Sequence, residues 1–378
     1  MPADFVPAMR RALELARRGE GLVEPNPQVG AVVVDGHGQI VGEGCHERFG
    51  GPHAEVMALA AAGAAARGAT LLVTLEPCCH HGKTPPCTDA VIAAGISRVV
   101  VATRDPFPAV NGSGIAALEA AGIPVETGLM APEAERLIAP FRTLLTAGRP
   151  WVIAKWAMSL DGRIATATGE SQWISGEASR GAVHRLRGRM DAILIGIGTA
   201  LADDPLLTAR PAGLRRALRI VVDSAARLPP TSRLVQTAPE IPLLVAVGPD
   251  APAQRTNHLE SLGCLVWRGS EADRGLRLRE LLHHLGQQRL TNLLVEGGNG
   301  VLGSFCDLKF VDEAWAFVAP KLIGGAAAPA PLGGQGHPRL ADAPRIAVEE
   351  LASLDGDVLI RGTVIHGEGR VTEATTTS

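Results

Sequence analysis

The sequence has little of what marks nucleic-acid-binding, membrane or exported proteins. None of its 378 residues is tyrosine, aromatic residues make up 3% of the chain, and the net charge is −3. Few aromatic side chains and no basic excess argue against a nucleic-acid partner. No apolar run reaches the ~18 residues that a membrane span needs, and the N-terminus turns charged at Arg10 where a secretory signal would need an apolar core. We therefore expect a cytoplasmic protein, not bound to membranes, whose partners are small molecules. We also expect a homo-oligomer, although the sequence does not fix the number of subunits.

Cysteine is also scarce. The chain has six cysteines, and three of them, Cys78, Cys79 and Cys87, fall within ten residues. This number and spacing do not suit a disulfide framework in a long chain of a reducing compartment. The cluster therefore indicates metal binding or catalysis, with a disulfide between Cys78 and Cys79 as the redox alternative.

Strands alternate with helices in the first part of the chain. The apolar patterns predict helices over 6–18, 54–66, 88–94 and 113–121, and strands over 31–36, 39–44, 70–75, 98–103 and 123–127. Such alternation predicts a mixed sheet sandwiched between helices.

A new pattern begins near residue 148, where Gly148 and Pro150 interrupt a helical stretch. We expect one domain over 1–147, a second over 148–366 and a disordered tail over 367–378. Buried-type strands are predicted over 151–157, 192–197, 218–223, 243–248, 292–297 and 313–319, with helices over 177–188, 275–286 and 300–308. The closing strands, 346–354 and 356–365, should pair antiparallel.

Potential zinc ligands occur in two segments of the first domain. His53 and Glu55 stand at a predicted helix start, and Cys78 and Cys87 follow the strand over 70–75. One imidazole and two thiolates would leave the fourth tetrahedral position of Zn²⁺ to water, as in catalytic sites. Zinc lowers the pKa of that water to about 7, and Glu55 lies close enough in sequence to move its proton. Cys79 is not expected to share an ion with its neighbour Cys78, while His80 and His81 remain alternative ligands on chemistry alone.

The order of these residues carries a resemblance. The His-x-Glu followed by Pro-Cys and a second Cys resembles the zinc-dependent cytidine deaminase-like superfamily, although eight residues rather than two separate Cys78 from Cys87. The longer form, TLEPC followed by HHGKTPPC, together with EPNPQVGAVVV at 24–34, is similar to the deaminase half of the bifunctional riboflavin-biosynthesis deaminase-reductases. The resemblance favours His53, Cys78 and Cys87 as ligands and Glu55 as the catalytic acid and base. It places Asn26 at the substrate base, and Lys83 and Thr84 at its phosphoribosyl end.

Three segments of the second domain, 154–175, 192–210 and 293–305, resemble the reductase half of the same family, which has a dihydrofolate-reductase-like fold. Glu296 and the glycines after it could offer backbone N–H groups and a helix N-terminus to a phosphate. The resemblance implies NADPH as hydride donor. Its expected binding residues are Ala157, Trp173, Thr199, Asp203, Ser224, Gly298, Asn299, Gly300, Val301, Leu302, Gly303 and Ser304. The expected substrate residues are Ser171, Arg187, Leu207, Arg210 and Glu296, with Arg187 and Arg210 able to clamp a sugar phosphate.

We therefore expect an α/β protein with a cytidine deaminase-like α/β/α domain followed by a dihydrofolate-reductase-like α/β domain. The expected activities are zinc-dependent deamination of 2,5-diamino-6-(5-phosphoribosylamino)pyrimidin-4(3H)-one and NADPH-dependent reduction of the ribosyl chain of 5-amino-6-(5-phosphoribosylamino)uracil. One alternative is a zinc deaminase of nucleic-acid bases with a non-catalytic C-terminal binding domain. Another is a zinc-stapled protein that senses NADPH without turnover. Some residues also have plainer alternatives: Asp203 and Asp204 could form a turn, Trp173 could belong to the core, and Lys155 could be an ion-paired lysine.

Overall fold

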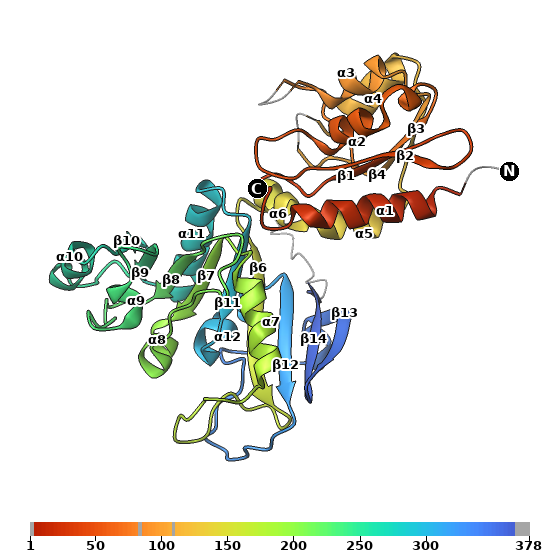
Figure 1. Ribbon diagram of the computed structural model, residues 1–378. Helices are drawn as coiled ribbons and strands as arrows, with labels where there is room; N and C mark the ends of the chain where they lie inside the picture. Colours follow the sequence, from red (N-terminus) through yellow and green to blue (C-terminus); the bar gives the residue numbers. More distant parts are fainter. Residues whose placement is uncertain (1–3, 82–84, 108–109, 367–378) are drawn as a thin grey trace, which may run out of the picture. The chain divides into compact units, whose positions relative to one another are not determined.

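The computed structural model describes residues 4–81, 85–107 and 110–366 (Figure 1). The predictions for Lys83, Thr84 and the tail 367–378 lie outside these residues. The chain divides into two compact units, one formed by 1–150 with 283–291 and the other by 151–282 with 292 onwards. Among the described residues, no helix combines the length and apolar character needed to cross a membrane.

The first unit is a five-stranded mixed sheet between helices. Its strands are β1 (Gly30–Val34), β2 (Ile40–Cys45), β3 (Thr70–Leu75), β4 (Arg98–Thr103) and β5 (Val125–Thr127). They are arranged in the order β2-β1-β3-β4-β5. β1 pairs antiparallel with β2 and β3, while β3, β4 and β5 run parallel. The predicted mixed sheet is confirmed.

Helices cover both faces of this sheet (Figure 1). They are α1 (Val6–Ala16), α2 (Ala54–Ala62), α3 (Cys87–Ala93), α4 (Ser113–Ala120), α5 (Ala131–Leu137) and α6 (Ala139–Ala147). Alternation along β1 shows why both faces need cover: Ala31 and Val33 pack in a core with α2, and Val32 and Val34 pack in a second core with α1.

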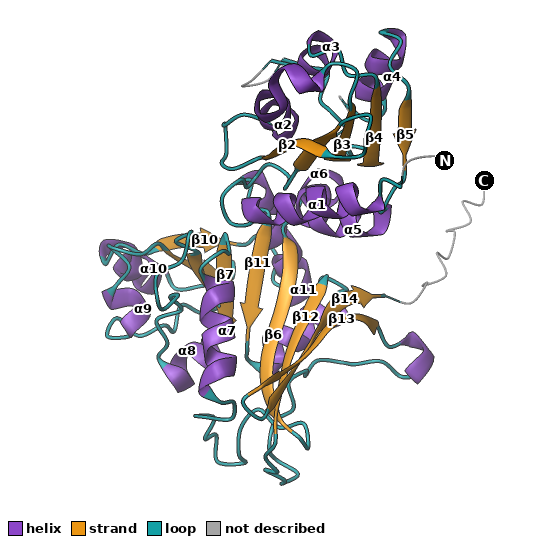
Figure 2. Cartoon of the chain, turned by 45° about the vertical axis from the view of Figure 1, so that its right-hand side comes forward, coloured by secondary structure: helices purple, strands orange, loops and turns teal. Residues whose placement is uncertain are grey.

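The second unit contains a nine-stranded sheet (Figure 2). Its strands are β6 (Trp151–Ser159), β7 (Ala192–Gly196), β8 (Leu218–Val222), β9 (Leu243–Val247), β10 (Leu265–Arg268), β11 (Asn292–Glu296), β12 (Glu313–Ala319), β13 (Arg345–Leu354) and β14 (Asp357–Ile365). The order is β10-β9-β8-β7-β11-β6-β12-β14-β13. The pairings from β10 to β12 are parallel, and β14 pairs antiparallel with β12 and β13. The predicted antiparallel pairing of the closing strands is confirmed.

The helices of the parallel part are α7 (Glu177–Arg187), α8 (Ile197–Asp203), α9 (Arg233–Gln236), α10 (Ala253–Ser261), α11 (Arg274–Gln287) and α12 (Asn299–Asp307). Apolar residues of α7, α9 and α10 share one buried core with β7, β8 and β9. Because β7, β8 and β11 are parallel, their carboxyl ends meet at one edge of the sheet, where open α/β sheets bind their ligands. The segments that follow these strands carry Thr199, Ser224 and Gly298.

Candidate active sites

The first candidate site forms around the start of α2. His53 is the extended residue immediately before this helix, and Glu55 lies in its first turn. Glu55 is only 3% exposed. Burial raises the pKa of Glu55 to about 6. A carboxyl group that titrates near neutral pH can both accept and release a proton, as acid–base catalysis requires.

The three predicted zinc ligands come together. Their ligand atoms all lie within 4.8 Å of one another, and His53 Nδ1 is 3.2 Å from Cys87 Sγ and 3.5 Å from Cys78 Sγ. Tetrahedral bonds from zinc to nitrogen and sulfur would place these atoms roughly 3.5 Å apart. The donor set and its spacing therefore fit zinc. His80, His81 and Cys79 lie outside this group in the described part of the chain, and Cys78 and Cys79 are both free thiols.

The thiols of Cys78 and Cys87 are hydrogen-bonded to each other, and the pKa values of both are shifted. Hydrogen bonds to Cys87 and His53 hold the pKa of Cys78 well below its usual value. The Cys87 backbone N–H also donates to Cys78 Sγ at 3.4 Å. The pKa of Cys87 is raised because its thiol donates to Cys78. A bound cation would favour the thiolate of both cysteines.

Glu76, two residues before Cys78, fixes the loop that carries the first thiolate. Its buried carboxylate accepts four backbone N–H bonds, at 3.0–3.2 Å, from Asp105, Gly112, Gly114 and Ile115. A Cβ atom on Gly114 would lie 2.0 Å from the Pro77 carbonyl oxygen, so this close approach requires glycine. No role was predicted for Glu76 from the sequence. The partners of Glu76 are 29–39 positions away, so no local pattern could reveal them.

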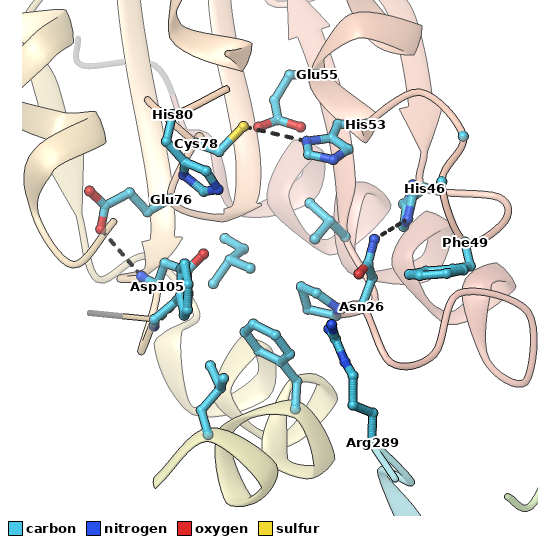
Figure 3. Close-up of a pocket in the computed structure, with 18 residues that line it drawn as sticks. Asn26, His46, Phe49, His53, Glu55, Glu76, Cys78, His80, Asp105 and Arg289 are labelled. Atoms are coloured by element: carbon cyan, nitrogen blue, oxygen red, sulfur yellow. Dashed lines mark hydrogen bonds between the residues drawn. The ribbon is translucent and has the colours of Figure 1, made fainter. Parts of the chain in front are cut away.

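A pocket opens beside the three ligands (Figure 3). It is lined by His53, Glu55 and Cys78, by the predicted base-binding residue Asn26, and by His46, Phe49, Glu76, His80, Asp105 and Phe107 among others. Burial raises the pKa of Asp105 to about 6. His46 and Asp105 were missed because neither belongs to a recognisable motif: His46 directly follows β2, and Asp105 lies two residues after the end of β4. A polar residue just beyond a strand was the only available signal.

The second candidate site contains a buried ion pair. The Arg187 guanidinium donates to both carboxylate oxygens of Glu296, at 2.5 and 2.8 Å. Lys155 is half-buried on β6 and pairs in register with Glu296 on β11. Burial lowers the pKa of Lys155, opposed by the charge of Glu296. Burial alone would raise the pKa of Glu296, but Arg187 holds it below its usual value.

Several predicted cofactor residues, among them Thr199, Ser224 and Gly298, lie in segments that directly follow the parallel strands β7, β8 and β11. A Cβ atom on Gly298 would lie 2.8 Å from Thr199 Oγ1, so the glycine turn and α8 approach closely. Gly298 immediately precedes α12, whose N-terminus leaves backbone N–H groups free for a phosphate. Ser224 Oγ accepts a bond from Arg277 at 2.7 Å. The glycine turn, with Arg274 Nη1 3.7 Å from a Cβ atom built on Gly300, fits a dinucleotide phosphate.

Other predicted residues also belong to the second unit. Ser171 donates to Asp203 at 3.1 Å, which joins a predicted substrate residue to a predicted cofactor residue. Trp173 is 62% exposed, so it is not a core residue. Leu207 is buried beside Arg187 in a second pocket, whereas Arg210 is exposed and does not line it.

Family models match both parts of the chain. Residues 6–103 match the cytidine and deoxycytidylate deaminase zinc-binding region, and residues 150–360 match the RibD C-terminal domain. The second match alone spans more than half of the 378 residues.

Relatives match along almost the whole chain. The riboflavin biosynthesis protein RibD of Escherichia coli is 42% identical over 368 residues, covering 93% of this chain and 97% of the relative. That of Actinobacillus pleuropneumoniae is 40% identical, covering 94% of each. Among solved structures, Acinetobacter baumannii RibD superposes with a TM-score of 0.83 at 37% identity, covering 96% of this chain and 99% of that one. The deaminase/reductase of Thermotoga maritima superposes with a TM-score of 0.80 at 36% identity, covering 95% of this chain and 98% of that one. The chain belongs to the RibD family of bifunctional, zinc- and NADPH-using riboflavin-biosynthesis deaminase-reductases.

Proposed function

We propose that this chain deaminates 2,5-diamino-6-(5-phosphoribosylamino)pyrimidin-4(3H)-one and then reduces the ribosyl chain of the resulting uracil to ribityl. The observation that carries the proposal is the convergence of His53, Cys78 and Cys87 beside the buried Glu55 in a pocket. The similar protein of Thermotoga maritima is a diaminohydroxyphosphoribosylaminopyrimidine deaminase and 5-amino-6-(5-phosphoribosylamino)uracil reductase.

Deamination uses the first unit. His53, Cys78 and Cys87 would hold zinc, which would supply a water activated near neutral pH. Glu55 would accept a proton from the attacking water, whose oxygen adds to the ring carbon that bears the 2-amino group. Glu55 then delivers the proton to the departing nitrogen, which leaves as ammonia. Asn26 holds the base, and Lys83 and Thr84 hold the phosphoribosyl end.

Reduction uses the second unit. NADPH held in the second unit would supply a hydride for C1 of the sugar, while the bond from C1 to the ring oxygen opens and that oxygen takes up a proton. The protein would orient the two partners and arrange the charge around them. Ala157, Trp173, Thr199, Asp203, Ser224 and the segment 298–304 hold the cofactor. Ser171, Arg187, Leu207, Arg210 and Glu296 hold the substrate. Because Arg187 is paired with Glu296, two of its donors are engaged before substrate arrives.

The proposal also divides the chain into a deaminase domain over 1–147 and a reductase domain over 148–366. A cytoplasmic location suits the free thiols of the metal site, which a reducing compartment preserves. We include a homo-oligomeric state in the proposal, which light scattering of the purified chain would test.

One experiment tests both activities. The purified chain is assayed for bound metal and then for ammonia release and NADPH oxidation, measured separately on the phosphorylated diaminopyrimidine. We expect zinc, ammonia from this substrate and NADPH oxidation after deamination. Absence of zinc, or ammonia release from an oligonucleotide instead, would contradict the proposal.

A further inference from the structure

His46 lies at the wall of the deaminase pocket, and its ring is held on two sides. It follows β2 and is 3% exposed. Its Nδ1 atom is 2.9 Å from the Pro52 carbonyl oxygen, and its Nε2 atom is 3.2 Å from Asn26 Nδ2 (Figure 3). The ring also meets the His53 ring edge-on, with centroids 5.4 Å apart. The proposed reaction assigns no role to this side chain.

The two contacts determine which nitrogen carries the proton. A carbonyl oxygen only accepts hydrogen bonds, so Nδ1 must be the donor to Pro52. In the neutral ring Nε2 is then an acceptor, and the group that faces it must donate. The Asn26 amide nitrogen does so. If the amide were reversed, its oxygen would face an Nε2 atom with no hydrogen to give.

This arrangement fixes the direction of the Asn26 amide. Its nitrogen faces His46, and its oxygen lies on the other side, toward the pocket (Figure 3). An amide oxygen can only accept, so the pocket offers an acceptor at this point.

We propose that His46 is a positioning residue that locks the Asn26 amide with its oxygen toward the substrate, so that Asn26 selects a pyrimidine bearing an N–H or amino donor at the facing edge. The inference rests on the proposed deamination, whose substrate carries amino groups and a ring N–H. A ring with only an acceptor at this edge would place two lone pairs against each other and leave the Asn26 oxygen unpaired.

Two variants separate this role from simple packing. His46→Gln can keep an acceptor near the Nε2 position, whereas His46→Phe keeps a ring and removes the acceptor. We expect His46→Phe to lower kcat/KM for ammonia release by roughly tenfold to a hundredfold, and His46→Gln to restore much of it. Zinc content and reduction of the deaminated substrate should stay unchanged in both. His37→Phe, at an exposed turn histidine, is the matched control.

A double-mutant cycle with Asn26→Ala supplies the decisive readout. If His46 acts through Asn26, adding His46→Phe to the Asn26→Ala variant should lower kcat/KM for ammonia release little further. Additive losses, or a glutamine variant no better than phenylalanine with zinc retained, would overturn the proposal.

A measurement on the unmodified protein does not depend on activity. Nitrogen NMR of the zinc-loaded full chain should show neutral His46 with its proton on Nδ1. A proton on Nε2 would overturn the proposal. If the unmodified chain released no ammonia, the proposed function would fail, while the proton position would still test the His46–Asn26 pair.

Discussion

Two glutamates, Glu55 and Glu76, are both 3% exposed and both line the deaminase pocket, yet their surroundings assign them different tasks. Glu76 accepts four backbone N–H bonds, so its carboxylate anchors the loop that carries Cys78. Burial raises the pKa of Glu55 to about 6, which favours proton transfer. The role proposed for Glu55 follows from the His-x-Glu motif, whereas the role of Glu76 depends on contacts formed only by the fold.

Glu55→Gln should retain zinc and lose deamination. The amide is nearly the same shape but cannot take up and return a proton, so ammonia release should fall by about 10²- to 10⁴-fold. Metal content and ammonia release measure the two effects. Glu47→Gln, at an exposed residue, is the control. A fully active Glu55→Gln variant would show that another group moves the proton.

Cys87→Ser should lose zinc and deamination together while reduction of the deaminated substrate continues. The thiolate is one of the three ligand atoms, and a serine hydroxyl is a poor replacement for it. Cys79→Ser should keep its zinc, because Cys79 lies outside the ligand group. The ligand assignment is wrong if these two variants behave in the reverse way.

Arg210→Ala should weaken the binding of the reductase substrate more than that of NADPH. The exposed Arg210 guanidinium is available to a phosphate, and loss of one charge-assisted contact costs about 1.5–3 kcal/mol, or roughly tenfold to a hundredfold in affinity. Separate KM values for substrate and NADPH check this, with Arg185→Ala on exposed surface as the control. An unchanged substrate KM would remove Arg210 from the phosphate site.

At the scale of elements, strong apolar periodicity allowed prediction and weak periodicity did not. The predicted strands 70–75, 98–103 and 313–319 match β3, β4 and β12 to the residue. No element was predicted over β10, whose four residues are half-buried or exposed, or over the helices α5, α8, α9 and α10. These elements are stabilised by neighbours that are distant in sequence, so their own residues carry little signal.

Gly114→Ala tests how α4 supports the metal loop. The added methyl group would collide with the Pro77 carbonyl oxygen, at 2.0 Å, and displace the segment that carries Cys78. Such overpacking costs about 1–3 kcal/mol, so the first unit should melt at a lower temperature and yield zinc more readily to a chelator. Gly36→Ala, where a Cβ atom would have nothing within 4 Å, is the control. If the two variants had the same melting temperature and released zinc equally readily, the Cys78 loop would be able to accommodate the methyl group without loss of stability.

At the scale of the whole molecule, the chain is two α/β units with different sheets, and each unit holds one candidate site. The two-part organisation was accessible from the sequence because the apolar pattern restarts after Gly148 and Pro150. The placement of 283–291 with the first unit was not, because this segment continues the helical pattern of the second half.

Removal of zinc by a chelator should therefore separate the two activities. Ammonia release should stop, since the three ligand residues all lie in the first unit. NADPH oxidation on already deaminated substrate should persist, because the residues proposed to hold NADPH lie in the second. Loss of both activities on chelation would show that the reductase unit also depends on the metal.

The hydrogen bonds of the Glu76 carboxylate also bear on how the first unit takes up its metal. Four backbone amides bond to Glu76 and hold the Cys78 loop through protein contacts alone. The metal site is therefore preorganised before zinc binds. Filling it then orders little chain, unlike in small zinc domains that collapse without their metal. The zinc-free protein should therefore regain deaminase activity when zinc is added back, without being unfolded and refolded.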